Sequence, residues 1–211
     1  MVKVKICGIT NVEDALWAAS LGADYIGLNF CKSSIRNISA ENAKGIVEKL
    51  PYFVIPVGVF VDEDENRIQK IVKKTNIKII QLHGNETPEK CRRIKEMLSL
   101  PVIKAFKVKD ETIIETIRNY LLDIDYILLD TYVEGMDGGT GVVFNWDIAA
   151  KISKECEKPV FLAGGITPEN VVSAIEKVSP YGIDVASGVE RSPRRKDYDK
   201  MRSLILSAKG L

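Results

Sequence analysis

Short apolar runs and amphipathic segments alternate along the whole chain, and this alternation constrains the fold most strongly. Several of the short runs are apolar at nearly every position, as expected for strands that are covered on both faces. The predicted strands are residues 2–6, 24–30, 53–61, 77–82, 101–108, 125–130, 159–165 and 182–188. The predicted helices are residues 11–23, 39–50, 62–75, 87–98, 110–121, 146–153, 167–178 and 196–209. Strands that alternate with helices pair in parallel through right-handed crossovers.

Eight strand–helix units in 211 residues predict the α/β class and a single (β/α)8 TIM barrel, near the small end of that fold. The structural rival is an open doubly wound sheet, which usually carries a G-x-G-x-x-G turn after its first strand. The turn here reads CGITN and has one glycine, so we favour the barrel. Because the chain contains no linker or low-complexity segment, we expect one domain over residues 1–211.

The charge balance narrows the range of partners. With 30 basic and 29 acidic side chains, the net charge of +1 offers no attraction for nucleic acid or an anionic membrane. The densest basic run, RSPRRK at 191–196, is interpreted as a solvated surface stretch, with a contribution to phosphate binding as the alternative. The N-terminal sequence lacks the apolar stretch of a signal peptide, and no apolar run is long enough to cross a bilayer.

The four cysteines form no C-x-x-C pair, and the chain has a single histidine. These counts argue against a zinc finger and against a disulfide framework. Reduced thiols fit best, and we therefore expect a cytoplasmic protein.

In a barrel of this kind the chemistry lies at the carboxyl ends of the strands. The polar residues expected there are Lys5, Cys7, Asn29 (with Arg36 beyond it), Gln81, His83, Asp130 and Asp184. A hydrophobic core needs none of these groups, so their convergence on one mouth predicts a polar ligand.

The last two strands carry a candidate phosphate site. Gly164 and Gly165 lead into a helix that we expect Thr167 to cap, and a second turn through Ser187 and Gly188 opens a short extra helix. Backbone N–H groups approach an anion closely where side chains are absent, and a helix N-terminus favours negative charge. Each motif alone could be an ordinary tight turn. Paired after neighbouring strands, the four residues other than Thr167 are the predicted phosphate contacts.

The segment TYVEGMDGGTG at 131–141 contains four glycines and is long for a connection after a strand. We interpret it either as a lid or as a surface loop without a role.

Motifs along almost the whole chain resemble those of the phosphoribosylanthranilate isomerase family of tryptophan biosynthesis. They are KICGIT, GLNF with Ser34, Arg36 and Ile38, VGVFV, QLHG, LLDT, GGTG, FLAGG, PENV and DVASGVE. The chain departs from the family pattern at Cys31 with Lys32, at Asn37 and at Ala186, which puts loop packing and one phosphate contact in doubt.

The resemblance implies an Amadori rearrangement of N-(5′-phosphoribosyl)anthranilate to a 1-deoxyribulose 5-phosphate derivative, without cofactor or metal. Asp130 matches the family's general acid and Cys7 its general base. Arg36 matches the residue that pairs with the anthranilate carboxylate, and His83 and Asp184 would line the pocket. The structural alternatives are a turn-capping Asp130, a packing thiol, a surface arginine and a buried histidine with satisfied hydrogen bonds.

Lys5 lies two residues before Cys7 on the same strand, so both side chains point to one face. A free thiol has a pKa of about 8.5, and the Lys5 cation is expected to favour the thiolate. We also place Lys5 among the predicted substrate-binding residues.

Three other readings remain open at this point. A pentose-phosphate epimerase would need a histidine-rich metal site, and an indole-glycerol-phosphate synthase would need a longer N-terminal extension. A non-catalytic phosphate-binding barrel is disfavoured by the presence of both Cys7 and Asp130. The expected partner is a small phosphosugar, and the sequence leaves monomer and homodimer open.

Overall fold

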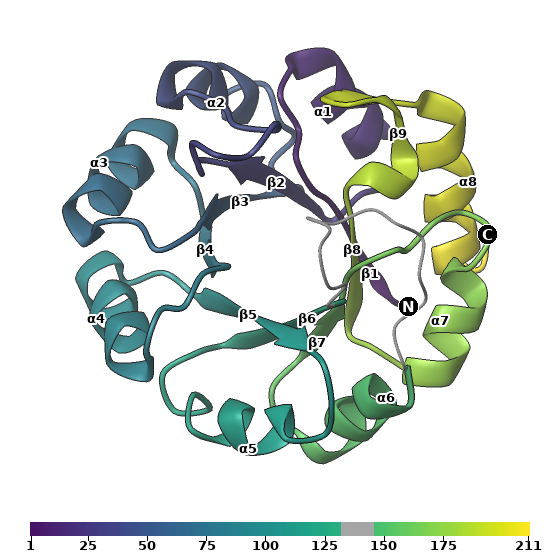
Figure 1. Cartoon of the computed structure of the whole chain (residues 1–211). Helices are drawn as coiled ribbons and strands as arrows, with labels where there is room; N and C mark the ends of the chain where they lie inside the picture. The colour runs from purple at the N-terminus through teal and green to yellow at the C-terminus, as the bar shows by residue number, and fades with distance from the viewer. Residues whose placement is uncertain (132–145) are drawn as a thin grey trace.

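The computed structural model describes residues 1–131 and 146–211, which form a closed barrel of eight parallel strands in chain order (Figure 1). The strands are β1 Lys3–Ile6, β2 Tyr25–Asn29, β3 Ile55–Phe60, β4 Ile79–Leu82, β5 Val102–Val108, β6 Tyr126–Thr131, β7 Val160–Leu162 and β8 Gly182–Val185. The surrounding helices are α1 Val12–Ser20, α2 Ala40–Val47, α3 Glu65–Thr75, α4 Pro88–Leu98, α5 Ile113–Arg118, α6 Trp146–Glu155, α7 Val171–Val178 and α8 Tyr198–Lys209. The prediction of a (β/α)8 barrel is confirmed.

Local signals explain where several helices begin. The Asn11 side chain accepts a hydrogen bond from the Asp14 N–H at 2.9 Å, and Ser39 accepts one from the Asn42 N–H at 3.2 Å. Pro88 occupies the first position of α4, where its missing N–H costs nothing. Side-chain oxygens at the N-cap satisfy N–H groups that the helix itself leaves unpaired.

The expected helix start at Thr167 is wrong. α7 begins at Val171, and the segment before it is a turn. The Thr167 N–H donates to Asn170 Oδ1 at 2.8 Å, and Asn170 Nδ2 donates to the Gly165 carbonyl at 2.8 Å. The asparagine side chain therefore closes the glycine loop instead of letting the helix extend to Thr167.

The basic run at 191–196 is only partly the solvated stretch that we expected. It belongs to a small antiparallel hairpin, β9 Glu190–Ser192 and β10 Arg195–Lys196. The three arginines of the run are exposed, but Lys196 is fully buried. A lysine is buried only when its charge finds partners, and Lys196 finds them beside the barrel mouth.

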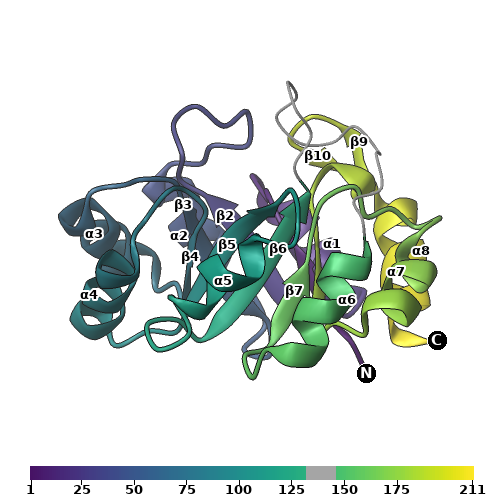
Figure 2. The same cartoon turned by 60° about the horizontal axis from the view of Figure 1, so that its bottom comes forward.

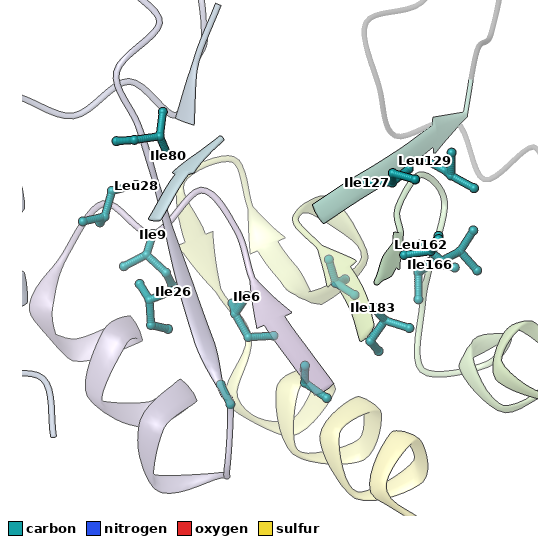
Figure 3. Close-up of a cluster of buried hydrophobic side chains, with 14 of the residues drawn as sticks. Ile6, Ile9, Ile26, Leu28, Ile80, Ile127, Leu129, Leu162, Ile166 and Ile183 are labelled. Carbon is teal, nitrogen blue, oxygen red and sulfur yellow. The ribbon is translucent and has the colours of Figure 1, made fainter. Parts of the chain in front are cut away.

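The core has two layers, separated by the barrel wall. The outer layer fills the space between strands and helices, and Figure 3 shows part of it, including Ile127 and Leu129 of β6. The inner layer fills the barrel itself and includes Leu128 of the same strand, with Tyr126 packed against it. Residues 126 and 128 face inward, so Asp130 at the end of β6 also lies on the inner face.

The two sides of the barrel differ in what they carry. Figure 2 shows the loop between β2 and α2 and the β9–β10 hairpin rising on one side, with both chain termini toward the other. The first side lies at the carboxyl ends of the strands, where the polar strand-end residues gather. Within residues 1–131 and 146–211, no helix is long and apolar enough to span a membrane.

Candidate active site

Strand periodicity brings most of the predicted site residues to one mouth. Lys5 on β1 is paired in register with Tyr25, a member of the inner core layer, so Lys5 and Cys7 share the inner face. Asp184 of β8 is the other register neighbour of Lys5. The inner row of β4 runs through Ile79 and Gln81, which places His83 at its end.

Two glycines make room for the Cys7 thiol and the Arg36 guanidinium. A Cβ atom on Gly27 would lie 2.6 Å from Cys7 Sγ, so only glycine leaves space for the sulfur there. Gly8 has a φ of +73°, and a Cβ on it would lie 2.4 Å from Arg36 Cδ. The glycine after Cys7 therefore serves both the turn and the close approach of Arg36.

Charged groups surround the thiol on the inner face. Lys5 Nζ lies 2.9 Å from Asp184 Oδ1, and the Lys5 side chain is 0% exposed. Burial and the Asp184 carboxylate raise the pKa of Cys7, while the charges of Lys5 and Lys196 act in the opposite direction without reversing the shift. Lys5 by itself lowers the pKa of Cys7, as we expected. The net effect keeps Cys7 a thiol in the free protein.

Lys5 is fully buried, and its ammonium pairs with Asp184 beside Cys7. The predicted contact between Lys5 and substrate stays a prediction. Burial lowers the pKa of Lys5, but Asp184 and Cys7 outweigh this effect and raise it, so Lys5 stays protonated.

Arg36 is held by a carboxylate of its own chain. Its Nε and Nη2 donate to the two oxygens of Glu190 at 2.8 and 2.7 Å, a bidentate pair. Lys196 Nζ lies 3.2 Å from Glu190 Oε1 and donates to the Ala186 carbonyl at 2.8 Å. Burial raises the pKa of Glu190, but the hydrogen bonds from Arg36 and the charge of Lys196 lower it further than burial raises it.

Asp130 belongs to a chain of three polar side chains. Its Oδ2 lies 3.2 Å from His83 Nε2, and His83 Nδ1 lies 2.9 Å from Gln81 Nε2. Gln81 is buried, whereas Asp130 and His83 are partly exposed. The carboxyl stands on β6 and the thiol directly after β1, and these strands are not neighbours in the barrel, so the two groups can act on one ligand from two directions.

The loops after β7 and β8 have the backbone geometry expected of an anion site. Gly164 and Gly165 have φ values of +82° and +64°. No described residue accepts a hydrogen bond from either N–H group. Gly188 packs on the neighbouring loop, because a Cβ there would lie 2.0 Å from the Ile166 carbonyl oxygen. Ser187 is exposed and opens the 3₁₀ turn η1 Ser187–Val189.

Comparison with known proteins gives this geometry a context. The family model for N-(5'phosphoribosyl)anthranilate (PRA) isomerase matches residues 4–207. The chain belongs to the phosphoribosylanthranilate isomerase family.

Individual relatives agree along the full length. The N-(5'-phosphoribosyl)anthranilate isomerase of Geotalea uraniireducens is 47% identical over 211 residues, 100% of both chains, and that of Pelobacter propionicus is 44% identical over 99% of this chain and 96% of the relative. The crystal structure of the phosphoribosyl anthranilate isomerase from Thermotoga maritima is 43% identical, covers both chains fully and superposes with a TM-score of 0.93. Another structure of such an isomerase, with a TM-score of 0.89, 43% identity and full coverage of both chains, contains reduced 1-(o-carboxyphenylamino)-1-deoxyribulose 5-phosphate.

Some features of this phosphoribosylanthranilate isomerase family member lie beyond the sequence predictions. Glu190 and Lys196 were missed, although Glu190 closes the DVASGVE segment. The contact between Glu190 and Arg36 spans 154 positions of chain, which no local pattern reveals. The predicted lid at 131–141 falls outside the described residues except for its first residue. Among the described residues, no group of three or more histidine, cysteine or acidic side chains could hold a metal ion.

The departures from the family pattern have local explanations. Asn37 Nδ2 donates to the backbone carbonyl of Cys31 at 2.9 Å, so the asparagine side chain helps to hold this loop together. The Ala186 carbonyl accepts the Lys196 hydrogen bond, a contact that needs no side chain at that position.

Proposed function

We propose that Asp130 is the general acid and Cys7 the general base of this isomerase. The enzyme rearranges N-(5′-phosphoribosyl)anthranilate to the open-chain 1-deoxyribulose 5-phosphate derivative in tryptophan biosynthesis. The observation that carries the assignment is the placement of one carboxyl and one thiol on the inner face of two separate strands, with the glycine loops beyond β7 and β8.

The reaction requires two proton transfers at different atoms of the sugar. Asp130 donates a proton to the furanose ring oxygen, the C1′–O bond breaks, and the anilino nitrogen lone pair forms the iminium. Cys7 then removes the proton from C2′, and the electron pair moves into the C1′–C2′ bond to give an enolamine. Tautomerisation of the enolamine yields the ketone. The iminium is the electron sink, so the protein supplies only an acid and a base.

The remaining residues would bind the two anionic ends of the substrate. Backbone N–H groups at Gly164 and Gly165, with Ser187 and Gly188, would hold the phosphate. Arg36 would pair with the anthranilate carboxylate. Glu190 occupies two of its nitrogens and fixes the plane of the guanidinium, which leaves Nη1 for the ligand.

His83 and Asp184 would complete the pocket wall beside the acid and the base. The partner is thus a small phosphosugar, and we propose a cytoplasmic enzyme that acts as a monomer or a homodimer. One solved structure contains monomers generated from the dimeric phosphoribosylanthranilate isomerase of Thermotoga maritima, so both states occur among similar chains.

Turnover of acid and base variants tests the assignment. The substrate is generated in situ from anthranilate and phosphoribosyl pyrophosphate, and its fluorescence is lost on conversion. We expect Cys7→Ser and Asp130→Asn each to lower kcat by about 10²- to 10⁴-fold, because each removes one proton-transfer group.

Cys156→Ser is the matched control. Cys156 is a partly exposed thiol that follows α6 and packs against the outer core layer, between strands and helices. It should leave turnover unchanged. An active wild type with a fully active Cys7→Ser would disprove the base assignment, and a wild type that binds substrate without converting it would disprove the proposed function.

A further inference from the structure

Gln81 makes one hydrogen bond where a buried amide normally makes more. Its side chain is buried, and its Oε1 has no hydrogen-bond partner. A buried acceptor left unpaired costs about 1–3 kcal/mol, so an apolar residue would be the cheaper choice at this position. The single bond that Gln81 does make, 2.9 Å from its Nε2 to His83 Nδ1, therefore needs an explanation beyond stability.

The orientation of this amide decides which nitrogen of His83 carries a proton. The Nε2 group of Gln81 can only donate, so the Nδ1 atom that receives it must be unprotonated. A neutral imidazole then carries its hydrogen on Nε2, the atom 3.2 Å from Asp130 Oδ2. His83 Nε2–H donates to that carboxyl oxygen.

The reverse orientation of the amide is less favourable. It would place Oε1 against His83 Nδ1 and move the NH₂ group to where Oε1 now lies without a partner. Two unpaired N–H donors would then replace one unpaired N–H and one unpaired acceptor, and a neutral His83 with its hydrogen on Nδ1 would turn a bare Nε2 toward the Asp130 carboxyl oxygen, 3.2 Å away. The geometry therefore selects the arrangement in which Gln81 donates.

We infer that Gln81 is a positioning residue that fixes the Nε2–H tautomer of His83 and thereby directs the acidic proton of Asp130 onto Oδ1. Because Oδ2 already accepts the His83 hydrogen bond, a protonated Asp130 holds its proton on the other oxygen. Oδ1 has no hydrogen bond to any residue that the structure describes, so its proton is free for a ligand. After transfer, the His83 hydrogen bond stabilises the carboxylate that remains.

The charged surroundings of Asp130 do not provide this control. Lys107 stands beside Asp130 in the β5–β6 register, but its side chain is exposed and forms no hydrogen bond or ion pair with Asp130, so it cannot choose between the two carboxyl oxygens. On the other neighbouring strand, the inner face of β7 offers Phe161 and, just beyond the strand, Ala163, which carry no charge. His83 is the polar side chain that contacts the Asp130 carboxyl among the described residues.

The inference rests on the proposed acid role of Asp130, but its first test does not need activity. The chain contains a single histidine, so ¹⁵N-histidine labelling yields one imidazole in the nuclear magnetic resonance spectrum. Without substrate at neutral pH, we expect the Nε2 signal in the protonated range and the Nδ1 signal in the unprotonated range. Protonated Nδ1 with bare Nε2 would overturn the inference.

Two substitutions connect the tautomer to catalysis. Gln81→Met keeps the length and removes the donor, and Gln81→Glu keeps the shape but offers only an acceptor to Nδ1. We expect a mixture of tautomers in the first and a protonated Nδ1 in the second, with kcat about 10- to 100-fold lower in each and KM nearly unchanged. Gln69→Met on α3 is the matched control and should alter neither the imidazole signals nor kcat.

A purely structural role gives a different result. Gln81→Met would then lower the thermal midpoint and leave the His83 signals unchanged, whereas we expect the midpoint to stay level or rise because the unpaired acceptor is gone. If the wild type lacks isomerase activity, the proposed function fails, while the resonance measurement still decides the tautomer. If Gln81→Met does not fold, Gln81→Glu carries the same test.

Discussion

At the scale of single residues, the chemistry of the mouth depends on how charges are arranged around Cys7. Burial and Asp184 raise the pKa of the thiol, and Lys5 and Lys196 only partly oppose them. A base with a raised pKa is mostly protonated at neutral pH but is a stronger base once it is ionised. We therefore expect kcat/KM to increase with pH through a pKa above the ordinary thiol value of about 8.5.

Asp184→Asn tests this arrangement. The substitution removes the negative charge that raises the pKa of Cys7 while the Lys5 cation remains, so the rising limb of the kcat/KM profile should move to lower pH. The measurement is the pH at which kcat/KM rises, between neutral and alkaline pH. The maximum value of kcat/KM is not used, because it also falls if Asp184 touches substrate. A limb that moves to higher pH would contradict the account.

The residues of the site were predictable to different degrees. Cys7, Asp130 and His83 follow from strand periodicity and from the rule that barrel chemistry lies at strand ends. The net direction of the Cys7 shift was not predictable, because it depends on burial and on a carboxylate 177 positions away along the chain, at Asp184. The orientation of the Gln81 side-chain amide was not predictable from sequence, because the argument for it depends on the unpaired Oε1 atom that the structure shows.

At the scale of elements, the loops after β7 and β8 work as one unit. Gly188 of η1 rests on the backbone of Ile166, where a Cβ atom would lie 2.0 Å from a carbonyl oxygen. Backbone contacts cannot yield as a flexible side chain does. The relative position of the two loops therefore depends on glycine at position 188. The proposed phosphate site depends on it as well.

Gly188→Ala should therefore weaken phosphate binding more than it affects proton transfer. We expect KM for the phosphorylated substrate to rise by about tenfold or more, equivalent to about 1.4 kcal/mol of binding, with a smaller change in kcat. Gly45→Ala on α2 is the control, because a Cβ there meets nothing within 4 Å. It should leave KM unchanged and stabilise the protein by about 0.5–1 kcal/mol. Equal KM values in the two variants would refute the role of the loop contact.

The elements themselves were predicted well where a cap or a proline marks the helix start, as at Asn11, Ser39 and Pro88. The prediction failed at Thr167, where threonine followed by proline is typical of a helix start. The competing Asn170 side chain bonds into the glycine loop and delays the helix. The hairpin at β9 and β10 was missed because strands of two or three residues leave no periodic pattern.

At the scale of the whole molecule, Asp24 joins the first strand to the last helix. Its oxygens accept hydrogen bonds from Lys3 Nζ at 2.9 Å, the Val4 N–H at 2.9 Å and Lys209 Nζ at 3.0 Å. Burial raises the pKa of Asp24, but the hydrogen bonds from Lys3, Val4 and Lys209 outweigh burial and lower it. One carboxylate thus helps to hold both ends of the chain against the amino-terminal side of the barrel.

Asp24→Asn should destabilise the fold by about 1–2 kcal/mol at pH 7, near the lower value because solvent screens a partly exposed carboxylate. A lowered pKa in the folded state means that the contribution is present above the unfolded pKa of about 3.9 and is lost as the pH falls through the folded value. Urea unfolding at pH 7 and in acid should therefore show the difference between wild type and variant shrinking at low pH. A constant difference would contradict this account.

The central claim is that Cys7 and Asp130 transfer protons and do not merely bind substrate. The most direct measurement is calorimetric titration of Cys7→Ala and Asp130→Asn with reduced 1-(o-carboxyphenylamino)-1-deoxyribulose 5-phosphate, beside their turnover numbers. We expect Kd within about threefold of wild type while kcat is at least about 10²-fold lower, because the lost interactions exist only in the transition state. Affinity that falls in proportion to kcat would show that the two residues hold the ligand, and the acid–base assignment would be wrong.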